Sequence, residues 1–351
     1  MNNSARKFTP YLHAPESIKQ TPQSATSIVS PIWDIFLVGG ISLIIFLFCS
    51  VWFQNAVPAG DAVAFILTLG FFVNLPHFLV SYQLLYGDFR KEIFSRFRFF
   101  WAAVLVPILL GGFLVASFTA STPASLGYSL NAMLFFVGWH YVKQTFGAVV
   151  VSNAAKNVFY SKIERFFLKS NLYTLWMVSF FSGNIGNHDA VQDGIHYFSL
   201  NFPYWFMNVA YLGLAVSASG VVFTHLKKFI NEGAAPSKMA VVSWLAIYVW
   251  LMPILIHPSY VHMIPMFHGL QYLLFVYSFR KNKVEANLKN IESSKKRKLW
   301  LVGIWGYLLG AVFLGVLASK VPPFVDGYFD WITRVPFTST PTVFFITVFI
   351  K

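Results

Sequence analysis

Nine long apolar runs dominate this sequence and limit the folds available to it. Most are close to the roughly 20 residues that a helix needs to cross a bilayer core. Because unpaired backbone groups are too costly in lipid, such runs must be helical. The pattern predicts an all-α integral membrane protein with about nine transmembrane helices. The runs are about Pro31–Phe53, Ala62–Tyr86, Phe99–Ala120, Tyr128–Val151, Asn171–Gly183, Pro203–Thr224, Met239–His257, Val261–Phe279 and Leu299–Ser319. A tenth run from Pro341 to Lys351 is only half a span.

The composition excludes several classes of protein. Of the 351 residues, 56% are hydrophobic and 11% are charged, and the mean hydropathy is +0.60. An ordinary soluble domain has about 25% charged residues. The chain is therefore not a disordered protein, a nucleic-acid-binding domain or an ordinary cytosolic enzyme. The single cysteine, Cys49, excludes an internal disulfide and a cysteine-based metal or redox motif.

The basic residues predict the orientation of the chain. If the runs alternate in direction, 22 of the 26 Lys and Arg residues fall on one side. Such residues concentrate in cytoplasmic loops. We therefore expect a polar cytoplasmic tail at 1–28 and one polytopic transmembrane domain at 29–351, with a basic cytoplasmic loop at 280–298 and an external loop at 184–202. The net charge of +13 then reflects topology and attraction to anionic lipids, in the cell (inner or plasma) membrane, and not nucleic-acid binding.

Three histidines lie inside three different apolar runs. Polar side chains are costly in hydrocarbon, so they are functional candidates. Counting 1.5 Å per residue from the external ends places His77, His140 and His268 at similar depths, near the membrane midplane. Three imidazoles that converge from separate helices provide a ligand set for iron, zinc or copper. The alternative is that each histidine makes an ordinary hydrogen bond between helices.

Further polar residues lie three or four positions from these histidines, on the same helix face. Gln144 follows His140 at four residues, and Gln271 and Tyr272 follow His268 at three and four. We expect Gln144 and Gln271 to orient the ligating rings, as partners of metal-bound histidines usually do. Ser81, four residues after His77, is a similar candidate. Lys143 and Tyr272 are candidates to polarise a substrate or oxygen, although Lys143 could instead extend its ammonium group to the interface.

The remaining polar groups carry weaker hypotheses. Asp34 lies near the cytoplasmic interface and is expected to cap or pair there. His262 is the preferred fourth metal ligand; it and His257 could also have interfacial roles. The external loop, with His188, Asp189, Asp193 and His196, reads as solvated or as a surface metal site. His13 and His225 are expected in solvent.

Several enzyme signatures are absent from the sequence. There is no His-Glu-x-x-His zinc motif, no Gly-x-Ser-x-Gly elbow, no phosphate-binding loop, and no set of desaturase histidine boxes. The three buried histidines therefore remain the main chemical signal.

The motif Leu75-Pro76-His77 resembles one that opens the histidine set of the Brp/Blh family of membrane carotenoid-cleaving dioxygenases. That resemblance implies a multispan fold with histidines around a non-haem iron, and His140 and His268 in the places of other ligands. The chain departs from the family at Phe78, where the family has glycine. It also lacks the family's paired histidines on one later helix.

These observations lead to one preferred function and two alternatives. The preferred hypothesis is a membrane metalloenzyme that uses non-haem iron, or another transition metal, to oxidise or cleave an apolar, lipid-like substrate within the bilayer. A proton- or ion-coupled transporter would use His140, Lys143 and Asp34 as a relay. A non-catalytic scaffold or assembly factor would use the histidines only for packing. The expected partners are membrane lipids and an apolar small molecule.

Overall fold

The computed structural model describes residues 27–55, 59–119, 123–186, 189–192, 195–255, 260, 263–288 and 293–333. The described chain is helical apart from one short hairpin. Its elements are α1 (Pro31–Ile35), η2 (Phe36–Gly40), α2 (Ile41–Asn55), α3 (Ala59–Tyr82), η3 (Gln83–Asp88), α4 (Arg90–Ile93), α5 (Phe97–Phe100), η4 (Trp101–Leu105), α6 (Val106–Thr119), α7 (Pro123–Ala154), α8 (Lys162–Ser182), β1 (Asp189–Gln192), β2 (Ile195–Phe198), α9 (Trp205–Glu232), α10 (Lys238–Leu251), η5 (Pro253–Leu255), α11 (Ile264–Asn287) and α12 (Ser293–Thr333).

Each of the nine apolar runs corresponds to a helix or to consecutive helical elements, so the predicted helical architecture is confirmed. Among the described residues, three helices are long and apolar enough to cross a membrane: Pro31–Phe48, Trp205–Glu232 and Lys298–Leu317. Phe97–Phe113 and Lys238–Leu251 are apolar but shorter. These helices mark the chain as a membrane protein. The half-span near the C-terminus lies outside the described residues.

Two boundaries differ from the sequence prediction. Helix α8 begins at Lys162, before the apolar run, because Ser161 and Glu164 form a reciprocal capping box at its start. The segment predicted as an external loop contains the antiparallel hairpin of β1 and β2, in which Asp189 pairs with Phe198. The Asn131 side chain of α7 donates to the Phe198 carbonyl and ties this hairpin to the helices.

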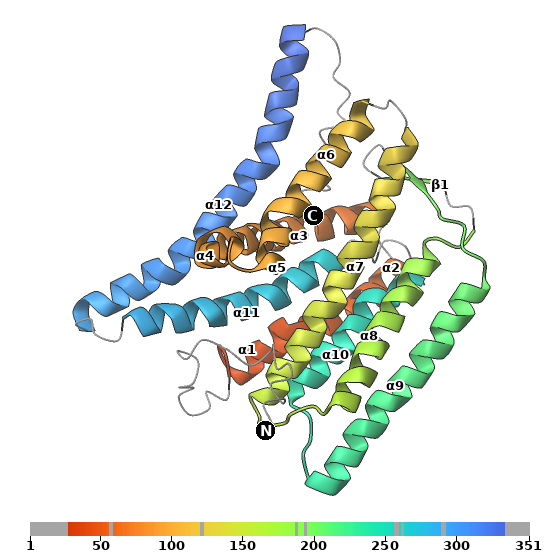
Figure 1. Ribbon diagram of the computed structural model, residues 1–351, viewed down its shortest axis with the longest axis vertical. Helices are drawn as coiled ribbons and strands as arrows, with labels where there is room; N and C mark the ends of the chain where they lie inside the picture. Colours follow the sequence, from red (N-terminus) through yellow and green to blue (C-terminus); the bar gives the residue numbers. More distant parts are fainter. Residues whose placement is uncertain are drawn as a thin grey trace, which may run out of the picture.

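The helices pack as two groups that meet at α11 (Figure 1). One group contains α7, α8, α9 and α10, and the other contains α3, α11 and α12. The larger core is formed by buried residues of the first group and of α11, including Trp176, Trp250 and Phe267. Because α11 contacts α3, α10 and α12, its side chains lie where the two groups join.

Glycine allows one close contact beneath this junction. Gly39, inside the π-helix η2, has a φ of 159°, which side-chain-bearing residues rarely adopt. A Cβ atom there would lie 2.4 Å from the Cβ atom of Ala246 in α10. Helix α10 therefore packs directly on the backbone of η2, and this irregular turn presents the Val38 carbonyl to Gln271 of α11.

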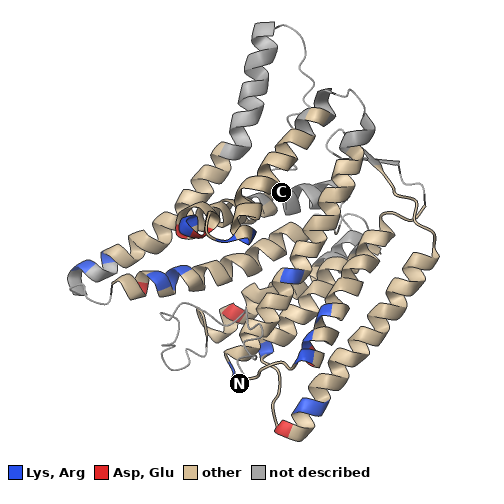
Figure 2. Ribbon diagram, in the orientation of Figure 1, with Lys and Arg blue, Asp and Glu red and all other residues tan. Residues whose placement is uncertain are grey.

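The basic residues of the described chain gather at the lower and left ends of the helices in Figure 2 and are sparse at the opposite ends. They lie in and between α4 and α5, just after α7, at the start of α8, near the end of α9, at the start of α10, near the end of α11 and at the start of α12, with Lys143 in the middle of α7 as an exception. This arrangement follows the alternating directions of the helices.

Candidate metal centre

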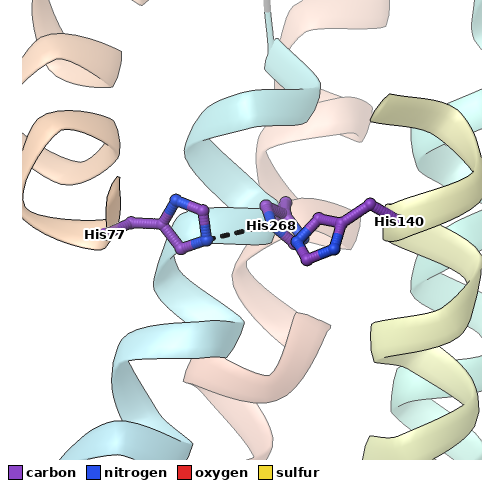
Figure 3. A group of neighbouring side chains, drawn as sticks. All are labelled: His77, His140 and His268. Carbon is purple, nitrogen blue, oxygen red and sulfur yellow. Dashed lines mark hydrogen bonds between the residues drawn. The ribbon is translucent and has the colours of Figure 1, made fainter. Parts of the chain in front are cut away.

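His77, His140 and His268 converge, as the sequence predicted. Each comes from a different helix: His77 from α3, His140 from α7 and His268 from α11. One ring nitrogen from each lies within 4.8 Å of the others, and the Nε2 atoms of His77 and His268 are 3.2 Å apart. Figure 3 shows His77 and His140 approaching His268 from opposite sides. Residues separated by 191 positions in the chain therefore share one site.

The spacing of these nitrogens suits a transition metal. At a metal–nitrogen distance of about 2.0–2.1 Å, two ligands in a tetrahedral site lie about 3.3 Å apart. The His77–His268 pair has this separation already. The ring centroids of His140 and His268 are 4.9 Å apart, and those of His140 and His77 are 6.4 Å apart. The third ligand nitrogen, from His140, lies within 4.8 Å of the other two.

Two buried histidine nitrogens have no hydrogen-bond partner among the residues that the structure describes. These are Nδ1 of His77 and Nδ1 of His268. Buried polar atoms in folded proteins are nearly always satisfied, and an exception indicates a functional group or a bound ion or water. His77 and His268 are 3% and 1% exposed, so bulk solvent does not satisfy them. The three-histidine donor set fits a metal ion bound at the paired Nε2 atoms, which would leave the proton of each ring on Nδ1.

Two tyrosines enclose the paired histidines. The ring of Tyr272 lies 4.5 Å from that of His77, nearly perpendicular to it, and the ring of Tyr141 lies 4.4 Å from that of His268. The Tyr272 hydroxyl accepts a hydrogen bond from Ser81, which also lies 3.0 Å from the His77 carbonyl. Tyr272 is therefore beside the histidines, as predicted. Sequence reasoning missed Tyr141, because adjacent residues do not share a helix face.

The two glutamines lie below the rings but bond elsewhere. Gln144 donates to the His268 carbonyl at 3.1 Å and to the Gln271 side-chain oxygen at 3.0 Å. Gln271 donates to the Val38 carbonyl of η2 at 2.7 Å and to Ser243 of α10 at 3.1 Å. Neither amide reaches a histidine ring in these bonds. The pair instead fixes the backbone of α11 at His268 and joins four elements of the core.

The cluster is open on the side of α7. His140 is exposed, whereas His77 and His268 are buried. Phe136 and Trp139, on the preceding turn of α7, are also exposed, at 62% and 38%. The approach to the histidines is thus an apolar, aromatic surface.

Lys143 lies on this same open side, three residues after His140. It is exposed, and its Nζ atom lies 4.1 Å from the centre of the Trp139 ring. The cation over the indole face is a favourable contact. Helix α7 has 32 residues, more than the predicted run, and Lys143 lies about 16 Å from its C-terminal end. The ammonium group is therefore near the cluster but does not contact the buried histidines.

The structure places the remaining predicted residues as follows. Asp34 is fully buried and accepts hydrogen bonds from the backbone of Ile28 and Val29, in the segment before α1, whereas the N-cap of α1 is Ser30. His262, the predicted fourth ligand, lies outside the described residues, as does His257. In the external segment, His188 and Asp193 are also outside them. Asp189 and His196 belong to β1 and β2, far along the chain from the three-histidine cluster.

No family model matches this sequence, and no curated protein or solved structure is significantly similar to it. The functional argument therefore depends on the geometry of the cluster itself.

Proposed function

We propose that this protein is a metalloenzyme of the cell membrane that binds a transition metal through His77, His140 and His268 and oxidises or cleaves an apolar, lipid-like substrate. The observation that carries the proposal is the convergence of three imidazoles from three helices, with one ring nitrogen from each within 4.8 Å of the others. A membrane helix bundle gains nothing in packing from three such residues, because apolar side chains fill the same space without unpaired polar atoms.

Iron is the metal that we propose. Imidazole ligands suit iron, zinc and copper. The resemblance of Leu75-Pro76-His77 to the opening motif of the Brp/Blh family favours non-haem iron among these. When bound, iron would supply the activation of dioxygen. His262 remains the proposed fourth ligand.

The residues around the cluster have separate roles in this proposal. The exposed aromatic surface at Phe136 and Trp139 leads an apolar substrate from the bilayer to His140. The ring of Tyr272 lies beside that of His77, and its hydroxyl, which bonds to Ser81, can hold a proton or polarise an oxygen atom. Gln144 fixes the backbone at His268, and Gln271 anchors Gln144.

The transporter hypothesis is weaker on this structure. It needs Asp34 to exchange protons or ions with His140 and Lys143. The Asp34 carboxylate instead accepts two backbone hydrogen bonds that hold the start of α1. A group held in this way is a poor relay, because protonating its carboxylate would weaken two backbone hydrogen bonds.

Activity can be tested with the purified chain in lipid nanodiscs. The iron-loaded protein should consume dioxygen only when an apolar polyene is present, and His268→Leu should abolish the uptake. The matched control is Trp250→Phe, a buried substitution in α10 that removes no polar contact made in the cluster. Dioxygen uptake that survives His268→Leu contradicts the proposal. Proton-coupled flux in vesicles that requires Lys143 would favour the transporter, and neither activity would favour the scaffold.

The nine-span topology is part of the proposal and has its own test. A reporter fused after Lys298 should report the cytoplasm, and one inserted in Asn187–Gly194 should report the exterior, because the basic loops are on one side. Detection of both reporters in the same compartment would contradict the topology.

A further inference from the structure

A second site lies at the basic end of the α7–α10 group. An apolar cavity of about 380 Å³ is lined there by residues of α7, α8, α9, α10 and the α9–α10 connection, among them Val149, Leu168, Val221, Ala235 and Trp244. A volume of this size is within the range of small-molecule pockets. Val149 is nine residues beyond His140 on α7, or about 13 Å along the helix. The cavity is therefore separate from the metal centre.

A chain of hydrogen bonds ends at one polar wall of this cavity. The Asn153 side-chain oxygen accepts from the Ser237 backbone at 2.7 Å, which fixes the amide so that its nitrogen donates to the Tyr160 hydroxyl. The Tyr160 proton is then left for His225, whose Nε2 atom is 3.3 Å away. In the tautomer in which Tyr160 donates to Nε2, His225 carries its own proton on Nδ1. Burial of the Tyr160 hydroxyl raises its pKa and keeps it a donor.

His225 and Tyr160 form the polar wall of the cavity, among lining residues that are mostly apolar. The sequence placed this histidine in solvent, but it is half-buried and lines the cavity next to Tyr160. No other partner is found for it within the described parts of the chain. An N–H donor in an apolar pocket selects a ligand that has an acceptor oxygen attached to an apolar chain.

The rim of the cavity is apolar and exposed. Val222, Leu226 and Phe229 of α9 line the cavity and are each more than half exposed. Exposed apolar side chains that surround a pocket mark an interaction with another apolar surface. In a membrane protein that surface is lipid, so an acyl chain can enter directly.

Positive charge surrounds this end of the helices. Exposed basic residues lie at the end of α7, the start of α8, the end of α9 and the start of α10, and Figure 2 shows them gathered there. The nearby acid Glu164 is neutralised by Lys228 at 3.2 Å. The net charge of the side chains at this end is therefore positive. The exposed basic residues are Lys156, Lys162, Arg165, Lys169, Lys227 and Lys238.

We propose that this cavity binds one anionic phospholipid. Its acyl chain occupies the apolar cavity, an ester or phosphate oxygen accepts from Nδ1–H of His225, and its phosphate lies among the exposed lysines. Charge complementarity favours an anionic headgroup over a zwitterionic one. The lipid site requires no metal, so its test does not depend on whether the proposed enzyme activity is found.

The test measures lipid retained by the full-length protein in detergent, by native mass spectrometry. Phosphatidylglycerol should be retained about tenfold better than phosphatidylcholine with the same acyl chains. Val222→Trp, at the exposed rim, should fill the cavity and reduce phosphatidylglycerol retention about tenfold. The matched control is Val216→Trp, two turns earlier on α9, because Val216 is 59% exposed and does not line the cavity.

A second variant tests the polar wall. His225→Phe should reduce retention of phosphatidylglycerol several-fold, and its melting temperature shows whether the fold is kept. Equal retention of the two phospholipids, or equal retention by the two tryptophan variants, would overturn the proposal. Complete displacement of phosphatidylglycerol by inorganic phosphate, or by an equal concentration of a free fatty acid, would also overturn it. The first result would assign the site to a free anion, and the second to a carboxylate lipid.

Discussion

Gln271 and His268 are buried polar residues one turn apart on α11, and they differ in their hydrogen bonding. Gln271 is fully buried, and its amide bonds to Val38, Ser243 and Gln144. His268 is equally buried, but its Nδ1 atom has no partner, and its Nε2 atom meets only another imidazole nitrogen. The glutamine therefore fastens helices together. The histidines are held in place but left free to bind something else.

The difference separates a polar residue whose hydrogen bonds are completed within the protein from one that keeps an unpartnered nitrogen among the described residues. Interhelical hydrogen bonds contribute to stability only where donors meet acceptors. Two imidazole nitrogens that face each other at 3.2 Å satisfy this rule only if one carries the single shared proton. A metal ion instead uses both nitrogens as ligands, since coordinating imidazoles are neutral.

The largest expected effect is a difference in stability between variants of Gln271 and variants of His268. Gln271→Leu removes bonds to three elements and strands their polar atoms, so we expect a loss of about 2–4 kcal/mol in the free energy of unfolding. His268→Leu should change the metal-free protein by less than about 1 kcal/mol, because it removes one nitrogen contact and one unpaired atom. Unfolding in increasing sodium dodecyl sulfate measures both. Equal destabilisation by the two substitutions would remove the distinction.

Adding metal should distinguish the Gln271 and His268 variants by a second measure, the stability gained on binding. At a free metal concentration of about 100 times the dissociation constant, the wild-type protein should gain about 2.7 kcal/mol of stability from binding. Gln271→Leu should keep part of this gain, whereas His268→Leu should lose it. Melting curves with iron and with a chelator provide the measurement. A gain that is the same in the wild type and His268→Leu would contradict a site at the histidines.

A smaller effect, on turnover, is expected for Lys143 on the open side of the histidine cluster. Lys143→Met should leave the fold and the metal content unchanged, because Lys143 is exposed and contacts Trp139 rather than the buried rings. We expect turnover of substrate to fall about tenfold, which corresponds to one charge-assisted contact. Lys169→Met is the matched control, since Lys169 also lies over an aromatic ring, that of Phe146, on the basic side of the bundle. Full activity in Lys143→Met would assign Lys143 to the interface alone.

The smallest effect concerns an ion pair outside the membrane core. Burial raises the pKa of Glu164, but bonds from Ser161 and Lys228 outweigh it and hold this pKa below its ordinary value of 4.5. A carboxylate with a lowered pKa stabilises the fold above pH 4.5 and loses that contribution as the pH falls further. Glu164→Gln should therefore lower the melting temperature by about 1–3 °C at pH 7.

The same substitution should have no effect once the pH is well below 4.5. Glu232→Gln is the control, because Glu232 is 61% exposed and lies 3.9 Å from Lys228. A difference between wild type and Glu164→Gln that persists unchanged in acid would show that the ion pair is not its origin.

Hydrophobic runs predicted the helices because lipid and a helical core both select apolar side chains over about 20 residues. The same runs missed the true start of α8, since its first turns are polar and only the capping box Ser161-x-x-Glu164 signals them. They also missed the hairpin of β1 and β2, which is too short for a strong alternating pattern.

Depth counting predicted that the three histidines meet, because helices that cross the same bilayer bring residues at equal depth to one level. Depth counting could not predict the hydrogen-bond partners of Gln144 and Gln271. Gln271 bonds the Val38 carbonyl because η2 is a π-helix, and an irregular turn of that kind leaves no mark in residue periodicity. The His225 pocket was missed for a similar reason, since its walls come from four helices and a connecting loop.

Metal analysis of the protein purified in detergent tests the central claim most directly. The wild type should retain about one transition-metal ion per chain, and His77→Leu, His140→Leu and His268→Leu should each retain almost none while still inserting into the membrane. His225→Phe, in the separate cavity, should keep the full content. A wild-type protein that binds no metal when offered iron, zinc or copper, or triad variants that bind as much as the wild type, would contradict the account.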